Sequence, residues 1–333
     1  MHFKTVFMFV LYFVPYILIL TGTVTGAFGL FSLVILMGLG LAGIGLSVMH
    51  DANHGAYSKK TWVNELVGYS LNLLGATSYT WKLQHNVLHH TYTNIHEEDE
   101  DISPRGVLRF SPHSNWKSMH RYQFIYAWPL YGLMTLVWLL VKDFTRLSRY
   151  NRIGLVTAQK GNLVKEWTIL FITKIFFVGY TFVIPLIFTP LLWWQILIGV
   201  VTMHFLAGFI LAIIFQPAHV IEGAEFPLPD ENRTIENNWA VHQLLTTTNF
   251  GNNSKWFSWY VGGLNFQIEH HLFPNVCHVH YNKIAGIVQT TAEEFGLPYK
   301  TSRTFIGALA GHARLLKQLG ARPVNSSTEL RTA

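Results

Sequence analysis

The chain has 333 residues, of which 50% are hydrophobic, 15% aromatic and only 13% charged. Soluble domains carry roughly 25% charged residues, so this composition indicates an integral membrane protein. The net charge of +6 does not indicate nucleic-acid binding, because the Lys and Arg residues form no aromatic-interleaved stripe and match no nucleic-acid motif. Cys277 is the only cysteine, which excludes disulfides within the chain and cysteine-ligated zinc or iron–sulfur sites.

Two long uncharged stretches predict four membrane-spanning helices. No Asp, Glu, Lys or Arg occurs in residues 5–50 or in residues 175–221, and one helical span needs about 20 residues. Turn-forming residues divide each stretch, at 21–26 and at 188–190. We therefore expect two helical hairpins, whose spans cover residues 5–22, 28–49, 172–189 and 194–216.

The distribution of positive charge predicts the orientation. Thirteen Lys or Arg residues lie between Lys59 and Lys165, whereas the turns within the two hairpins carry none. Lys and Arg accumulate in cytoplasmic loops, so we expect both termini and the segments 50–170 and 217–333 on the cytoplasmic side of a bacterial inner membrane or the endoplasmic reticulum. The predicted fold is all-α, a single membrane domain over residues 1–333 with a cytoplasmic helical cap.

Two further apolar stretches, residues 62–80 and 122–141, lie within the predicted cytoplasmic segment. Polar residues, Pro129 and Gly132 interrupt them. If the second stretch crossed the membrane, the later parts of the chain would change sides. We therefore expect both stretches to lie in the membrane interface.

Three histidine clusters adjoin the predicted spans. They are His50-Asp51-Ala52-Asn53-His54, His85-Asn86-Val87-Leu88-His89-His90 and Gln267-Ile268-Glu269-His270-His271. Neutral imidazole is the commonest nitrogen ligand of transition metals. His85 and His89 are one helical turn apart and share a face. Because the predicted topology brings all three clusters to one side of the membrane, they predict one metal centre assembled by folding, held in the helical cap.

The clusters supply seven candidate ligands, and His219, directly after the fourth span, is an eighth. A structural zinc takes four ligands, so this number indicates two ions, or one ion with many hydrogen-bonded neighbours. Gln267 shares a helical face with His270 and could bind a metal directly or through water. The candidate ligands are His50, His54, His85, His89, His90, His219, His270 and His271.

Carboxylates within the clusters could orient the ligating imidazoles as hydrogen-bond acceptors. Asp51 and Glu269 are the candidates, and the acidic run at residues 97–101 could do the same or form a solvated loop. Imidazole ligands suit iron, copper, zinc or nickel, so the residue types leave the metal open. Isolated histidines are interpreted as structural; these are His2, His96, His113, His120, His204 and His312.

These features resemble the membrane fatty acid desaturase family. Its signature is three histidine boxes, H-x(3,4)-H, H-x(2,3)-H-H and [HQ]-x-x-H-H, on the cytoplasmic side of four spans. Here the boxes read HDANH, HNVLHH and QIEHH, and the resemblance covers about residues 5–280. It implies that the boxes bind two iron ions (Fe2+) together with an extra histidine after the last span, which is the position of His219.

The resemblance also implies O2-dependent desaturation of a fatty acyl chain linked to CoA, a carrier protein or a glycerolipid. Gln267 at the start of the third box is similar to front-end and related acyl-lipid desaturases. Many of those enzymes carry a fused cytochrome b5 domain with an H-P-G-G haem motif, but this chain has no His-Pro pair. We therefore expect electrons from a separate ferredoxin, or from cytochrome b5 with its reductase.

Elementary chemistry agrees with this resemblance. Removing hydrogen from an unactivated methylene group requires a strong oxidant, which zinc cannot provide because it has no redox chemistry. The acyl chain also requires an apolar slot that reaches the metal. Two alternatives stay open: a di-iron lipid hydroxylase or oxygenase with the same boxes, and a membrane metal transporter. A transporter would place ligands near the middle of the membrane, where only His204 is expected.

Overall fold

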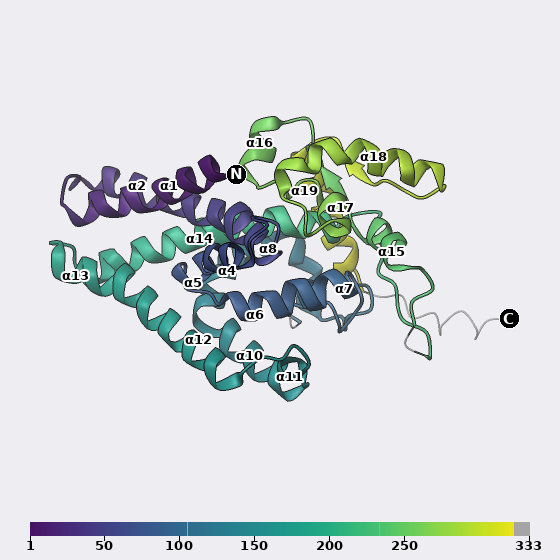
Figure 1. Cartoon of the computed structure of the whole chain (residues 1–333), viewed down its shortest axis with the longest axis horizontal. Coiled ribbons are helices and arrows are strands. Elements are labelled where there is room, and N and C mark those ends of the chain that lie inside the picture. The colour runs from purple at the N-terminus through teal and green to yellow at the C-terminus, as the bar shows by residue number, and fades with distance from the viewer. Residues whose placement is uncertain (105, 233, 323–333) are drawn as a thin grey trace.

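The computed structural model describes residues 1–104, 106–232 and 234–322, and this part of the chain is mostly helical (Figure 1). Long helices extend to one side of the molecule, and shorter helices from the middle and end of the chain gather at the other side. The two strands among the described residues, β1 (Asn249–Phe250) and β2 (Thr301–Ser302), form a short parallel pair with Asn249 opposite Thr301.

In the described part of the chain, four helices are long and apolar enough to cross a membrane, which confirms the prediction of four spans in an all-α membrane protein. The first is α1 (His2–Leu20). Two of the others contain a π-helical segment, and the last is continuous. The remaining bounds are α2 (Ala27–Gly43), a π-helical segment (Ile44–Val48) and α3 (Met49–Asn53); α12 (Leu163–Val178), a π-helical segment (Gly179–Val183) and α13 (Ile184–Phe188); and α14 (Trp193–His219).

The third helix begins at Leu163, earlier than the start expected at residue 172. Hydropathy places the boundary too late because Lys165 and Glu166 near the start of the helix are charged, although neither of them interrupts the helix. The second helix continues to Asn53, so its last turns carry His50.

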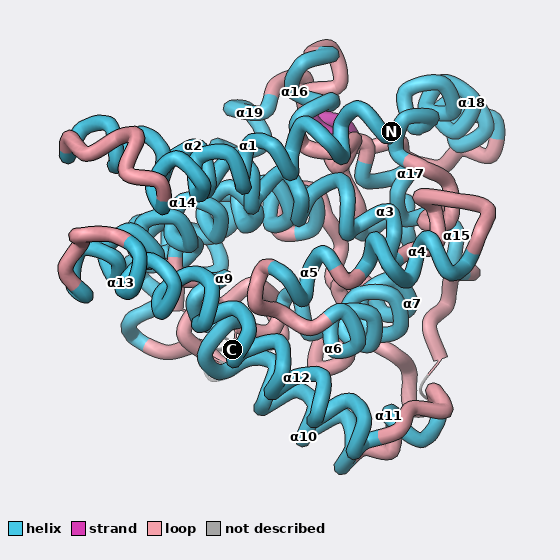
Figure 2. The backbone as a smooth tube through the Cα atoms, turned by 60° about the vertical axis from the view of Figure 1, so that its left-hand side comes forward, coloured by secondary structure: helices cyan, strands magenta, loops and turns pink. Residues whose placement is uncertain are grey.

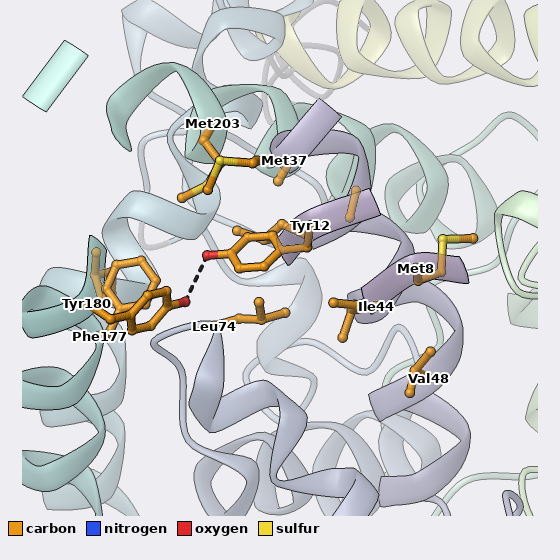
Figure 3. Packing of buried hydrophobic residues seen from close by; sticks show 13 residues of the cluster. Met8, Tyr12, Met37, Ile44, Val48, Leu74, Phe177, Tyr180 and Met203 are labelled. Atoms are coloured by element: carbon orange, nitrogen blue, oxygen red, sulfur yellow. Dashed lines mark hydrogen bonds between the residues drawn. The ribbon is translucent and has the colours of Figure 1, made fainter. Parts of the chain in front are cut away.

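Close backbone contact holds the first, second and fourth long helices together. A Cβ atom on Gly40 of α2 would lie 2.7 Å from the Tyr12 backbone nitrogen of α1, and one on Gly38 would lie 3.1 Å from the Met203 carbonyl oxygen of α14. Small residues permit such approaches between helices in lipid. Beside this contact the Tyr12 and Tyr180 hydroxyls are 2.8 Å apart in a core that also contains Met37 (Figure 3).

The segment between the second and third long helices folds into short helices. The apolar stretch 62–80 is divided among α4, α5 and α6. Helices Ser118–Gly132 and Met134–Arg152, which contain the stretch 122–141, meet at an angle of 61°. By length and composition this bent pair could be a fifth span, so its interfacial position stays a prediction. The bounds are α4 (Thr61–Gly68), α5 (Ser70–Leu73), α6 (Ser78–Lys82), a π-helical segment (Leu83–His89), α7 (His90–Tyr92), 3-10 turns (Glu100–Ile102 and Ser118–Tyr122), α8 (Gln123–Gly132), α9 (Met134–Val137), a π-helical segment (Trp138–Lys142), α10 (Asp143–Arg152) and α11 (Leu155–Ala158).

The chain after α14 folds back over the ends of the long helices. Figures 1 and 2 show α15 and α17 near α7, at the end of the molecule away from the hairpin turns. The last helix, α19, packs against α8 and α14. The bounds are α15 (Trp239–Thr246), α16 (Lys255–Tyr260), α17 (Gln267–Leu272), a 3-10 turn (His278–His280), α18 (Tyr281–Glu294) and α19 (Phe305–Gly320).

A buried ion pair joins the third long helix to the middle segment. The Lys174 ammonium donates to Asp143 Oδ2 at 2.7 Å and to the Gly75 carbonyl oxygen at 2.7 Å. Asp143 is fully buried and also accepts from the Thr77 backbone N–H and the Trp138 indole N–H. A buried carboxylate is tolerated only with such partners, so this network fixes the position of α12 against the segment 75–143.

We predict that Lys174→Met destabilises the protein by about 3 kcal/mol, because it leaves the buried Asp143 carboxylate without its counter-charge. Thermal or denaturant unfolding in detergent measures the effect. Lys165→Met is the matched control: Lys165 is exposed near the start of the same helix, and its loss should change the free energy of unfolding by less than about 0.5 kcal/mol. Equal stability of the two variants would contradict the prediction.

Candidate metal centre

The eight candidate imidazoles come together, although four separate parts of the chain supply them. The end of the second long helix carries the first pair, the Leu83–His89 segment and the start of α7 carry the next three, and α14 and α17 carry the rest. All eight side chains are buried. Their positions are His50 and His54, then His85, His89 and His90, then His219, and finally His270 and His271.

The imidazoles form two adjoining groups. In the first, one nitrogen from each of four residues lies within 4.8 Å of the others, namely His50, His54, His85 and His270. In the second, His89, His219 and His271 meet the same condition.

His90 lies between the two groups. Its Nε2 atom is 3.3 Å from His85 Nε2 and 3.1 Å from His270 Nε2, and it also forms a close group with His270 and His271. The centre is thus continuous, with His90 and His270 at the junction of its two halves.

A π-helical segment arranges the middle cluster. In a π-helix the backbone bonds run from residue i to i+5, so residues five apart lie on one face. His85 and His90 have this spacing. The His85 and His89 rings also stack, with centroids 5.1 Å apart. The wider turn therefore lets three histidines of one short segment reach the same centre, where an α-helix would align only His85 and His89.

The inner nitrogens of this centre lack hydrogen-bond partners. Within the described residues, Nε2 of His50, His54, His219 and His271 is buried and unpaired. Gln267 Oε1 is also buried and unpaired, while its amide nitrogen donates to the Leu264 carbonyl oxygen. Each such atom costs about 1–3 kcal/mol unless a ligand binds it. A donor set of unpaired imidazole nitrogens therefore fits metal ions.

Most of these imidazoles are neutral, which is the form that binds metals. Burial lowers the pKa of His54, His85, His90, His270 and His271 well below the usual value, and neighbouring imidazoles lower it further. His89 differs: burial lowers its pKa, but the Asp99 carboxylate more than compensates and raises the pKa to about 8. Both Asp99 oxygens lie 3.0 Å from His89 Nδ1.

Five of the eight imidazoles have a partner at Nδ1, namely His85, His89, His219, His270 and His271. His85 Nδ1 lies 3.3 Å from Asp101, and His270 Nδ1 lies 3.2 Å from the Tyr281 hydroxyl. The remaining pairs are His271 Nδ1 with Gln243 Oε1 at 2.8 Å and His219 Nδ1 with the Thr246 carbonyl oxygen at 3.3 Å. Such contacts fix the tautomer and the ring orientation of ligating histidines.

The two carboxylates expected to orient the imidazoles make other contacts in the structure, and their role in orienting metal ligands stays a prediction. Asp51 accepts from His278 Nδ1 at 2.8 Å, and the Lys4 ammonium lies 2.6 Å from His278 Nε2. Glu269 accepts from Asn249 and Tyr299. Both residues lie in the helices that carry the cluster histidines.

The acidic run supplies the carboxylates instead, through Asp99 and Asp101. Gln243 and Tyr281 were not predicted, because a single Gln or Tyr outside a cluster carries no signal in the sequence. Among the isolated histidines, His120 and His312 hydrogen-bond within the fold, and none of the six belongs to either imidazole group. His204 lies inside α14, where its Nδ1 is 3.2 Å from the Thr135 hydroxyl.

An apolar cavity of about 100 Å³ extends from the imidazoles into the helix bundle. His85, His89 and His219 line its metal end, and Leu74, Thr135 and His204 line its other end. The remaining lining is mostly apolar. The cavity matches the apolar slot expected from the sequence and offers space for a short run of methylene groups.

The four apolar spans and the buried imidazole groups are those of an integral membrane protein with a candidate metal site. The chain belongs to the fatty acid desaturase family, which matches residues 6–303. It is therefore an oxidoreductase, and its histidine clusters are compatible with the iron that this family implies.

Curated relatives are acyl-lipid desaturases. The chain is 38% identical to an sn-1 linoleoyl-lipid 6-desaturase of Arthrospira platensis over 89% of its length and 79% of the relative. It is 36% identical to an sn-1 linoleoyl-lipid 6-desaturase of Synechocystis over 85% of its length and 79% of the relative. An acyl-lipid (8-3)-desaturase of Physcomitrium patens is 39% identical over 85% of this chain and 59% of the relative.

We predict that Cys277 reacts slowly with iodoacetamide in the folded protein. Burial and the neighbouring Asp51 carboxylate raise the pKa of its thiol to about 12, and only the thiolate reacts. At pH 8 labelling should be slower than in the unfolded protein by roughly three orders of magnitude, since an ordinary thiol has a pKa of about 8.5, and it should rise only above about pH 11. Labelling kinetics followed by mass spectrometry measure this.

Asp51→Asn provides the comparison for the Cys277 experiment. This substitution removes the negative charge while leaving the burial of the thiol nearly unchanged, so labelling should become faster and its pH midpoint should fall. A rate that is the same in both proteins would show that Asp51 does not act on Cys277.

Proposed function

We propose that this protein introduces a double bond into a lipid-linked fatty acyl chain, using O2 and two iron ions (Fe2+) held by its histidines. The observation that supports this proposal is the pair of buried imidazole groups, with unpaired inner nitrogens, at one end of an apolar cavity. We treat residues 1–333 as a single membrane desaturase domain.

The two imidazole groups would hold one ion each. His50, His54, His85 and His270 would bind the first ion, and His89, His219 and His271 would bind the second. His90 lies at the junction of the groups and is available to either ion. Gln267 would bind through its unpaired oxygen, directly or through a water molecule.

When bound and reduced, an iron pair supplies O2 activation, with two electrons from a donor and two from the substrate, to remove two hydrogens from neighbouring methylene groups. The side chains of this protein prepare the site for that chemistry. Asp99 and Asp101 hold His89 and His85 through Nδ1 and make their Nε2 atoms better ligands. The apolar lining orients the chain and excludes water from the reacting carbons.

The relatives support front-end desaturation of a glycerolipid substrate. In that reaction the new double bond lies between an existing double bond and the carboxyl end of the chain. Two relatives are named as 6-desaturases of an sn-1 linoleoyl lipid, and the third box of this chain begins with Gln267 as in that group. We propose a separate ferredoxin or cytochrome b5 as the electron donor, and a cytoplasmic position for the imidazole centre and both termini.

We predict that His89→Ala abolishes desaturation and lowers the iron content of the purified protein, because it removes a ligand from the second group. Expression in a host with linoleoyl lipids, followed by gas chromatography–mass spectrometry, measures the product. A loss of two hydrogens identifies desaturation, whereas the gain of one oxygen would identify a hydroxylase. His280→Ala is the control, since His280 is exposed and lies outside both groups. Wild-type amounts of product from His89→Ala would refute the proposed centre.

Asp99→Asn should weaken metal binding roughly 10–100-fold, the usual effect of losing a partner that hydrogen-bonds a ligating histidine. The fold should persist, because Asn retains the shape of the side chain. Iron retained after dialysis against graded chelator concentrations measures the affinity. Glu98→Gln is the matched control, since Glu98 is exposed in the same acidic run. Identical iron retention in Asp99→Asn and in the wild type would contradict the role given to Asp99.

A further inference from the structure

One wall of the apolar cavity is partly exposed, whereas the other lining side chains are buried. Three residues of this wall recur every four positions along the helix Met134–Arg152, and two lie on α14. Helices α9 and α14 contact each other directly. These two helices therefore carry most of the partly exposed lining. The partly exposed residues are Met134, Trp138 and Lys142, then Phe215 and Gln216, and finally Asp101.

The outer face of the same helix is apolar. Val137, Leu140 and Val141 lie next to the wall residues in sequence and are 49%, 67% and 49% exposed. Exposed apolar side chains at this density indicate contact with lipid rather than water. An acyl chain could therefore pass from the bilayer into the cavity without crossing water.

The polar side chains of this wall lie at its metal end. Asp101 already contacts His85 Nδ1 and the Gln84 amide, and a carboxylate cannot donate to an ester oxygen. Lys142 and Gln216 are the hydrogen-bond donors there. The Lys142 ammonium lies 4.2 Å from the centre of the Trp138 ring, which holds it over the wall.

We propose that this partly exposed wall is a lateral portal for the acyl chain of a glycerolipid, and that Lys142, assisted by Gln216, binds the ester carbonyl oxygen of that chain. The inference rests on the proposed function and adds the residues that set the position of the new double bond. A saturated hydrocarbon segment offers nothing for hydrogen bonding. If the position of the new double bond is set relative to the carboxyl end, the enzyme has to hold the ester group at a fixed distance from the reacting carbons.

A lysine suits this role for a physical reason. A charged donor forms a stronger hydrogen bond with a carbonyl oxygen than a neutral donor does, and partial burial strengthens it further. Losing such a bond typically costs about tenfold or more in affinity. Without this hydrogen bond the acyl chain is also free to slide along the apolar slot. Dispersion contacts with methylene groups are nearly the same at each position of the chain along the slot.

The test is the positional distribution of new double bonds made by the full-length protein in a host with linoleoyl glycerolipids. We expect one positional isomer from the wild type. From Lys142→Met we expect a mixture of neighbouring isomers and about tenfold less product per molecule, whereas Lys142→Arg should restore the single isomer. Gln216→Leu should give a smaller shift in the same direction. Gas chromatography–mass spectrometry of derivatised fatty acids locates each double bond.

Arg152→Gln is the matched control, since Arg152 is an exposed cation further along the same helix and does not line the cavity. The wild-type isomer alone, at an undiminished amount, from both Lys142→Met and Gln216→Leu would overturn the inference. The inference would also be overturned if Arg152→Gln gave the same mixture of double-bond positions as Lys142→Met. If the wild type binds iron and makes one isomer while Lys142→Met and Gln216→Leu both behave identically to it, only the portal is contradicted. A wild-type protein without iron or product contradicts the proposed function itself.

Discussion

The structure depends on the burial of eight imidazoles against one another. Four of their inner nitrogens have no partner among the described residues, and each unpaired buried nitrogen costs about 1–3 kcal/mol. The total is comparable with the net stability of a typical domain, about 5–15 kcal/mol. Such an arrangement is stable only if something binds between the rings, and neutral imidazoles favour metal cations there.

The rest of the fold supplies hydrogen-bond partners for the imidazoles and holds the helices that carry them together. Carboxylates of the 97–101 run hold His89 and His85 from outside, and residues after the last span hold His270 and His271. The long helices bring their ends to one place because glycines such as Gly40 allow close packing. The Lys174–Asp143 ion pair positions the helices around the cavity that opens at the imidazoles.

Much of the architecture was predictable because it follows from local patterns. The four apolar helices were evident from uncharged stretches, since hydropathy acts through each segment separately. The start of the third helix was not, because Lys165 and Glu166 near its beginning are charged and hydropathy therefore places the boundary after them. The histidine clusters were evident, but the contacts of Asp51 and Glu269 depend on the direction in which each side chain leaves its helix.

The sequence by itself determined the class of the protein, the four spans and the set of histidines that could bind metal, because hydropathy and box spacing are properties of the chain alone. Only the tertiary structure decided how the imidazoles divide into two groups, which oxygens face their Nδ1 atoms, and which side chains line the cavity. These features join residues that are as far apart in the sequence as His90 and His270. They therefore depend on helix packing, which no local pattern encodes.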